Sequence, residues 1–265
     1  AYADEAIRSL LDQEGAEVVI HLVDDASPED TQKFMRFWGT HRHVRTYRNQ
    51  RNIGQFLSFN NVVPYRETDL VAVQDADDIS LPQRICWSGN CLRLADADLF
   101  GGRMRLFGAT RSVAPTKQVR RRRGRLRRRP GYRSSQFPTR YELHFLENPT
   151  AVMRASTFEL LGGFGDFGEV YRNRCGLDTE FYLRAFYCGR RFAVSNRVVL
   201  HYRCHRDSAT QNALTGWGTA PRRWSELECR RRAALFQKAG YDPRLFGALG
   251  SHVGVTQRLN GKSKR

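Results

Sequence analysis

Two short apolar runs that end abruptly in aspartates constrain the fold of this chain more than any other feature. The runs are residues 17–23 and residues 69–74, and the acids that follow them are Asp24, Asp25, Asp75, Asp77 and Asp78. Continuous apolar runs of this length are typical of strands that are buried on both faces. Because ligands of such sheets bind beyond the carboxyl ends of the strands, we expect the two acidic clusters to lie side by side at one sheet edge.

Helical patterns separate these runs and continue beyond them. The expected helices cover residues 4–13, 28–38, 52–63, 82–94, 157–161, 179–188 and 224–239, and further extended segments cover residues 43–47, 99–107 and 191–202. Ser27 is the expected N-cap of the helix that begins at Pro28. Strands that alternate with helices predict an α/β fold with a mixed, mostly parallel sheet flanked by helices.

The charge of the chain is concentrated in one segment. The sequence holds 44 Lys and Arg against 27 Asp and Glu, a formal net charge of +17. Residues 117–133 contain many arginines and no acid, and we interpret residues 114–138 as an exposed insert. Arg120–Arg129 could contact a polyanion, and a solvated loop without a partner explains the same pattern. Tyr132 is the only aromatic residue among these arginines, which argues against a stacking platform for nucleic acid bases.

Several protein classes are disfavoured by the sequence. No apolar run approaches the roughly 20 residues of a membrane-spanning helix, and Ala1–Glu5 has no features of a secretory signal. The six cysteines form no CxxC pair, so reduced thiols are expected rather than a zinc ribbon or a disulfide framework. We therefore expect a cytoplasmic protein, either free or peripheral at the membrane.

The Asp75-Ala76-Asp77 sequence has two interpretations. Two carboxylates at a strand end can present oxygen atoms to a hard divalent cation, which in turn binds a diphosphate. A solvated turn is the more common explanation of such a short pattern when it stands alone. The second acid-terminated strand, before Asp24 and Asp25, favours the ligand-binding interpretation.

Further short motifs occur in a fixed order along the chain. They are Ser9–Gln13, Val23–Thr31, Asn52–Gly54 with Asn60, Gln74–Asp78 with Pro82 and Arg84, Val152–Arg154, Leu161–Phe164, Gly176–Phe181 and Tyr202–His205 with Ser208–Thr210. With this order and spacing, residues 1–212 resemble the inverting family 2 glycosyltransferases, which have the Rossmann-like GT-A fold. The resemblance implies a metal-dependent enzyme that moves a sugar from a nucleoside-diphosphate donor, such as a UDP-, GDP- or dTDP-sugar, to an acceptor hydroxyl.

The resemblance also implies roles for individual residues. Asp25, with Asp24 beside it, would bind the nucleotide base, and Asp75 would bind the ribose. Asp77 would ligate Mn²⁺ or Mg²⁺, with His205 as a further candidate ligand. Arg203 would contact the diphosphate. The expected roles for Asp178 are general base for the acceptor hydroxyl or N-cap of the helix that follows it. Asn52 could place a helix N-terminus near the nucleotide, although a plain helix start explains it as well.

The resemblance divides the chain into regions and leaves one element out. Residues 1–214 would form the glycosyltransferase domain, with a donor half (1–108), the basic insert (114–138) and an acceptor half (139–214), followed by a helical extension with a basic tail (215–265). Ala1 falls just after the position of the first family strand, so that central strand is expected to be lacking. Candidate acceptors are a glycan, a lipid-linked sugar, a protein or a nucleic acid. The alternative function is a basic nucleic-acid-binding protein on an inactive glycosyltransferase-like scaffold.

Overall fold

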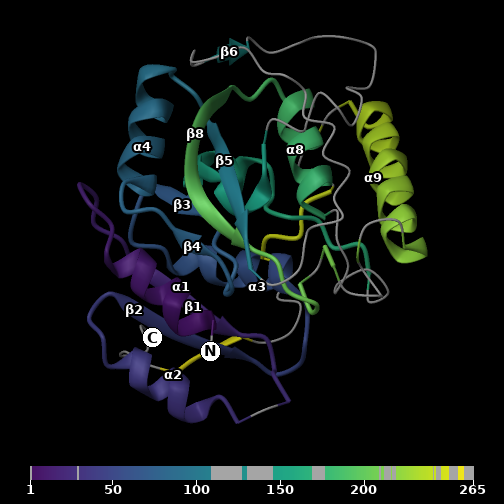
Figure 1. Cartoon of the computed structure of the whole chain (residues 1–265). Helices are drawn as coiled ribbons and strands as arrows, with labels where there is room; N and C mark the ends of the chain where they lie inside the picture. The colour runs from purple at the N-terminus through teal and green to yellow at the C-terminus, as the bar shows by residue number, and fades with distance from the viewer. Residues whose placement is uncertain are drawn as a thin grey trace.

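The computed structural model describes most of the chain. The described residues are 2–28, 30–108, 127–129, 146–168, 177–208, 210–211, 216, 219–240, 242, 246–250 and 256–259. Of residues 127–129, only the backbone is described. Most of the predicted insert 114–138 and the basic tail therefore lie outside the described residues. The arrangement of the elements is shown in Figure 1.

A small sheet forms the part of the molecule that carries the N-terminal helix. It consists of β1 (Ile20–Asp24), β2 (Val44–Asn49) and β9 (Thr256–Arg258), in the order β1-β2-β9. Strands β1 and β2 are parallel, and β9 joins β2 from near the end of the chain in antiparallel fashion. Helices α1 (Tyr2–Leu11) and α2 (Gln32–Gly39) pack on this sheet through buried Ile7, Ile20, Trp38 and Val44.

A larger sheet forms the centre of the molecule. Its strands are β3 (Leu70–Ala72), β7 (Val152–Arg154), β5 (Leu99–Phe107), β8 (Phe192–Arg203) and β4 (Ile79–Ser80), in that order, with β6 (Arg127–Arg129) also paired to β8. The other described helices are α3 (Gln55–Val62), η1 (Val63–Tyr65), α4 (Arg84–Leu94), η2 (Asn148–Thr150), α6 (Ala155–Leu160), α8 (Leu177–Tyr187) and α9 (Ala220–Lys238). Helix α4 lies on one side of β5 and β8, and α8 lies on the other, with α9 outside it (Figure 1).

The α/β class and the mixed sheet are confirmed, but the expectation of mostly parallel pairing is wrong for the described strands. Only β1 with β2 and β5 with β8 are parallel, and the other five pairings are antiparallel. The short strand β7 is antiparallel to both of its neighbours, β3 and β5. Strands β4 and β6 are each antiparallel to β8. Apolar runs alone do not encode strand direction.

The two acid-terminated strands also belong to different sheets. Strand β1 pairs with β2, and β3 pairs with β7, so the expectation that both strands lie side by side in one sheet is wrong. Among the residues of known placement no strand joins β1 to β3.

The start of α2 differs from the expectation as well. The helix begins at Gln32 with Thr31 at its N-cap position, so Ser27 is not the cap. Instead, the Ser27 backbone N–H donates to the Asp24 carboxylate at 2.9 Å, which closes a turn over residues 24–27. The helix begins four residues after Pro28.

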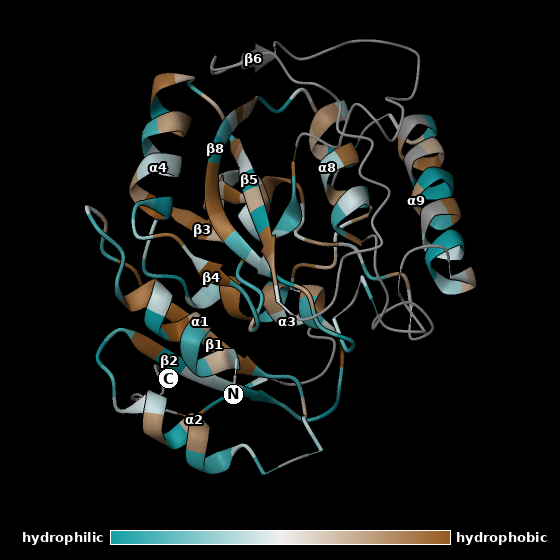
Figure 2. Ribbon diagram, in the orientation of Figure 1, coloured by the Kyte–Doolittle hydropathy of each residue, from teal (hydrophilic) through white to brown (hydrophobic). Residues whose placement is uncertain are grey.

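An aromatic core joins α3, α6 and α8 beneath the larger sheet. Phe164 lies 4.9 Å from Phe56, 5.4 Å from Phe158 and 4.9 Å from Phe181, measured between ring centroids. All four side chains are buried. Figure 2 shows hydrophobic and hydrophilic residues alternating along α8, which contributes Phe181 to this core. This packing fixes the position of α8, whose first turn carries Asp178.

A buried ion pair fastens the loop after α6 to α8. The Arg184 guanidinium donates to both carboxylate oxygens of Glu180, at 3.0 and 2.8 Å, and both side chains are almost completely buried. The same guanidinium donates to the carbonyl oxygens of Leu161 and Gly163. The ion pair thus compensates both buried charges. Arg184 also satisfies two carbonyl oxygens of the turn around Gly162, which fixes this turn against α8.

None of the helices within the described ranges is long and apolar enough to cross a bilayer. The five cysteines whose placement is described (Cys86, Cys91, Cys188, Cys204 and Cys229) are free thiols.

The buried pair predicts a large loss of stability on removal of one partner. Arg184→Met leaves the Glu180 carboxylate buried without its cation, which should lower the free energy of unfolding by about 3–5 kcal/mol. Urea denaturation measures this change. The matched control is Arg66→Met in the surface pair with Glu159, where we expect less than about 1 kcal/mol. Equal losses in the two variants would contradict the assignment.

Candidate active site

Three carboxylates gather in the loop between β3 and β4. The ligand atoms of Asp75, Asp77 and Asp78 all lie within 4.8 Å of one another. Asp78 is fully buried, and its Oδ2 atom has no hydrogen-bond partner within the described part of the chain. Carboxylate oxygens are the ligands that Mg²⁺ and Mn²⁺ prefer, and an unpartnered buried oxygen fits a position that a cation would satisfy. The residues present therefore fit a divalent cation.

Burial and neighbouring charge raise the pKa values of Asp75 and Asp78. Burial is the largest cause for Asp75, followed by the charges of Asp77 and Asp178, and together they raise its pKa to about 7. Burial and the neighbouring charge of Asp75 raise the pKa of Asp78 to about 8, against the opposing hydrogen bond from the Arg203 backbone. Like charges at this separation repel each other strongly in a partly enclosed site. Asp75 and Asp78 therefore keep their protons to a higher pH than ordinary carboxyl groups do.

Arg84 supports the acidic loop from α4. Its buried guanidinium donates to Gln74 Oε1 at 2.7 Å and to the carbonyl oxygens of Val73 at 2.6 Å and Pro149 at 2.8 Å. Burial lowers the pKa of Arg84 to about 10, although the charges of Asp78 and Asp75 oppose this shift. Arg84 thus connects the backbone just before the cluster to η2 and partly offsets the negative charge of the cluster.

His205 contacts the predicted metal ligand directly. Its Nε2 atom lies 2.8 Å from Asp77 Oδ2, and its ring centroid lies 5.2 Å from that of Tyr2. The structure therefore brings His205 and Asp77 together, and their roles as metal ligands stay a prediction. Which ring nitrogen carries the proton depends on the tautomer.

Arg203 braces the same loop. Its backbone N–H donates to Asp78 Oδ1 at 2.9 Å and its Nε to the Asp77 carbonyl oxygen at 2.8 Å. The guanidinium also donates to Glu5 on α1 at 2.7 Å. It lies between the rings of Tyr2 and Phe107, at 4.3 and 4.6 Å from their centroids. In this arrangement Arg203 ties α1 and the end of β5 to the acidic loop, and its contact with a diphosphate stays a prediction.

Asp25, the residue after β1, is hydrogen-bonded to β2 and to the segment that leads into α3. Asp25 accepts from Asn49 Nδ2 at 2.7 Å and from the backbone N–H groups of Ile53 and Gly54 at 2.9 and 2.7 Å. Its carboxylate therefore occupies the N-terminal end of α3, and Asn52 is exposed beside it. This is the helix end at which we had expected a nucleotide, so any base contact of Asp25 would coexist with these bonds.

Asp24 is buried and paired. It accepts from Thr31 and from the Ser27 backbone, and it forms an ion pair with Arg48. Burial alone would raise the pKa of Asp24, but the hydrogen bonds from Thr31 and Ser27 and the charge of Arg48 outweigh it, so the pKa is lowered. Asp24 shapes the loop after β1, whereas Asp25 is the more exposed of the two acids.

Asp178 lies in the first turn of α8, one residue inside the helix start at Leu177, rather than at the N-cap. Its charge contributes to the raised pKa of Asp75 and, after burial, to that of Tyr182. The hydroxyl of buried Tyr182 donates to Asn148 Oδ1 at 2.7 Å. The structure thus brings Asp178 within electrostatic reach of the acidic cluster, which the order of the chain alone does not reveal.

Several contributors to the site were not assigned a role from the sequence. Asp78, Arg84, Asn148, Tyr182, Tyr2 and Glu5 all belong to this group. The position of Asp78 next to Asp77 could have indicated its role. No sequence pattern indicates that Tyr2 and Glu5 contact Arg203, about two hundred positions away.

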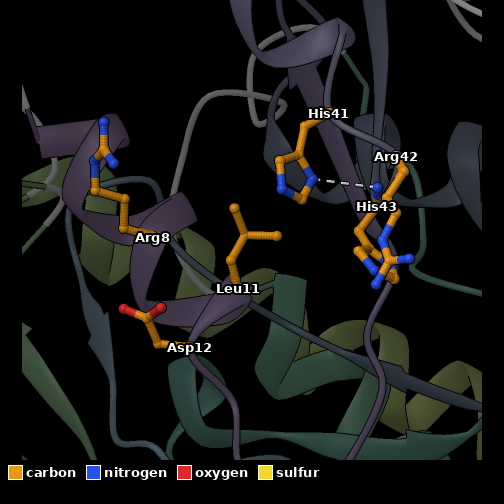
Figure 3. Close-up of a pocket in the computed structure, with 6 residues that line it drawn as sticks. All are labelled: Arg8, Leu11, Asp12, His41, Arg42 and His43. Carbon is orange, nitrogen blue, oxygen red and sulfur yellow. Dashed lines mark hydrogen bonds between the residues drawn. The ribbon is translucent and has the colours of Figure 1, made fainter.

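A separate hollow of about 460 Å³ lies elsewhere, between the end of α1 and the segment before β2 (Figure 3). Its lining is mostly cationic or imidazole: Arg8, Leu11, Asp12, His41, Arg42 and His43. Because Val44 pairs with Ile20 at the amino ends of β1 and β2, this hollow lies at the opposite end of the strands from Asp24 and Asp25. It is therefore no part of the acidic site.

Raised carboxyl pKa values predict a pH-dependent effect of Mn²⁺. Ionising Asp75 and Asp78 costs more in the folded than in the unfolded chain, so the cation-free protein loses stability as pH rises from about 4 to about 8. A cation binds only the ionised carboxylates. Below their pKa values, its affinity should therefore fall roughly tenfold for each unit that the pH is lowered, for each proton that the cation displaces.

The rise in melting temperature with Mn²⁺ should therefore be larger at pH 8.0 than at pH 6.0. Comparison with and without Mn²⁺ at each pH cancels groups such as His21, whose pKa burial lowers to about 4. In Asp77→Asn the shift should be small at both pH values. An equal shift in the wild type at both would show that these carboxyls are not ligands.

Comparisons with known proteins identify similar sequences and folds. The family described as Glycosyl transferase family 2 matches residues 1–162. Residues 1–349 of Staphylococcus aureus TarS in complex with UDP-GlcNAc superpose with a TM-score of 0.65 at 16% identity, over 88% of this chain and 62% of that one. The complex with UDP gives 0.61 at 15% identity, over 88% and 61%. The longer TarS structure gives 0.62 at 15% identity, over 89% and 37%. No curated protein matches the sequence significantly. This chain thus spans less than two thirds of the structures that it resembles.

Proposed function

We propose a function from one premise: this chain belongs to glycosyl transferase family 2. The proposed function is a metal-dependent, inverting transfer of a sugar from a nucleoside-diphosphate donor to an acceptor hydroxyl. The observation that carries it is the cluster of Asp75, Asp77 and Asp78, with Asp178 in electrostatic reach. The TarS complexes with UDP and UDP-GlcNAc make UDP-GlcNAc the first donor to test.

The acidic loop would hold the cation on the donor side. Asp77 is the proposed ligand, assisted by Asp78 and by His205 at 2.8 Å from Asp77, and Asp75 would bind the ribose. A divalent cation bound there neutralises negative charge that develops on the departing diphosphate. Arg203 and Arg84 keep the loop in place through their backbone hydrogen bonds. In this proposal Asp25 contacts the base, with Asp24 and Asn52 shaping the surrounding loops.

Asp178 would act on the acceptor. A carboxylate on the opposite side of the sugar can remove the proton of the acceptor hydroxyl as that oxygen attacks the anomeric carbon. The bond from the anomeric carbon to the diphosphate breaks on the opposite face, so the configuration inverts in one step. No covalent enzyme nucleophile is needed.

We favour this function over nucleic-acid binding on an inactive scaffold. The carboxylates of the acidic loop repel phosphate unless a cation lies between them, and a polyanion-binding scaffold gains nothing from such a cluster. Contact between Arg120–Arg129 and a polyanionic acceptor stays a proposal.

Two variants separate the proposed roles. Asp178→Asn removes the base and should lower kcat for UDP release from UDP-GlcNAc by about 10²–10⁴-fold, while the Kd for UDP stays unchanged. Asp77→Asn should remove the strengthening of UDP binding by Mn²⁺. A coupled assay for UDP and isothermal titration of UDP provide the two measurements. Full turnover in Asp178→Asn, or unaltered Mn²⁺-dependent binding in Asp77→Asn, would contradict the assignments.

A further inference from the structure

Helix α9 carries three large apolar side chains that are exposed to solvent. Trp224, Leu227 and Leu235 are 60%, 56% and 40% exposed. The other exposed large apolar residues of the described chain are Tyr2, Phe37, Tyr65, Leu94, Leu106, Leu160 and Leu259, which fall singly on different elements or their ends. Single exposed apolar residues are normal, but three on one helix face form a patch that calls for a partner.

The two faces of α9 are distinct. Ser225, Cys229 and Phe236 are buried, and α9 packs beside α8 at the edge of the molecule (Figure 1). On the other face, the spacing of three and eleven residues from Trp224 aligns Leu227 and Leu235 along one stripe. The core-facing residues already account for the packing of the helix. The outer stripe is therefore not required to hold α9 in place.

Cations accompany this stripe. Arg223, Arg230, Arg231 and Lys238 are exposed on α9. The helix carries six basic residues, Arg222, Arg223, Arg230, Arg231, Arg232 and Lys238, against two acids, Glu226 and Glu228. Arg231 forms a bidentate pair with Glu228 at 2.7 and 2.6 Å. Figure 2 shows hydrophobic and hydrophilic residues mixed along the helix.

We propose that the outer face of α9 docks on an anionic lipid surface. The same face of α9 carries a Trp, two leucines, Arg231 and Lys238, with Arg223 and Arg230 beside it. Helices that lie in the membrane interface mix such residues, because the apolar side chains enter the acyl boundary while long cationic side chains reach the headgroups. A second copy of the chain fits less well, since an isologous contact would bring the same cations together. The charge complementarity thus selects anionic lipid as the occupant.

Docking in this way has a consequence for the acceptor side, and this step rests on the proposed function. Cys229 on α9 has a raised pKa chiefly from burial, with contributions from the charges of Glu180 and Asp178, so α9 lies near the first turn of α8. A helix held on the bilayer would keep Asp178 near that surface, where a lipid-linked acceptor is found.

Vesicle flotation tests the docking separately from catalysis. We expect the whole chain to float with vesicles of phosphatidylcholine and phosphatidylglycerol, to bind pure phosphatidylcholine weakly, and to lose binding as NaCl is raised. Trp224→Ser combined with Leu227→Ser should weaken partitioning about tenfold or more. The matched control is Leu94→Ser on α4, 69% exposed, which should bind as the wild type does.

The contradicting outcomes are equally definite. The inference is overturned if the wild type does not float with anionic vesicles. It is also overturned if the α9 double variant floats as well as the wild type. Loss of flotation only on deletion of residues 117–133 would then assign the binding to that segment instead. It is also overturned if the double variant changes a monomer–dimer equilibrium in sedimentation while vesicle binding is unaltered. A melting-temperature shift with UDP and Mn²⁺, preserved in the double variant, verifies its fold and separates failure of docking from failure of the proposed function.

Discussion

The repulsion among three carboxylates in the loop between β3 and β4 is the constraint on which the rest of the site depends. Asp75, Asp77 and Asp78 have ligand atoms within 4.8 Å of one another, and Asp78 is completely buried. Such a loop persists only if neighbouring groups hold its backbone and if protons or a cation compensate its charge. Arg84 supplies the first kind of support from α4, and Arg203 supplies it from the end of β8.

The fold brings these supports together from distant parts of the chain. Arg203 connects the acidic loop to Glu5 on α1, while the aromatic core around Phe164 and the Glu180–Arg184 pair hold the helix that carries Asp178. In the proposed function, the acidic loop and the helix that carries Asp178 would suit an in-line displacement, in which the two reacting groups approach the sugar from opposite faces. The docking proposed for α9 would orient that helix toward a lipid surface.

The sequence was sufficient for some of this arrangement. The α/β class and the extent of the extended segment at residues 99–107 follow from local patterns and from the family resemblance. Strand direction did not follow, because the apolar run in β7 is the same whether the strand lies parallel or antiparallel to β5. The placement of β1 and β3 in separate sheets, the sandwich of Arg203 between Tyr2 and Phe107, and the use of Asp25 to cap α3 depend on tertiary contacts that no local pattern encodes.

Electron paramagnetic resonance of free Mn²⁺ during titration with the protein, with and without UDP, tests the central claim most directly. The account predicts one bound Mn²⁺ per chain, tighter binding when UDP is present, and loss of this site in Asp77→Ala, because linkage makes the cation and the nucleotide strengthen each other equally. Binding of Mn²⁺ that is indifferent to both UDP and Asp77 would contradict the account, since the carboxylate cluster would then not be where the donor and its cation meet.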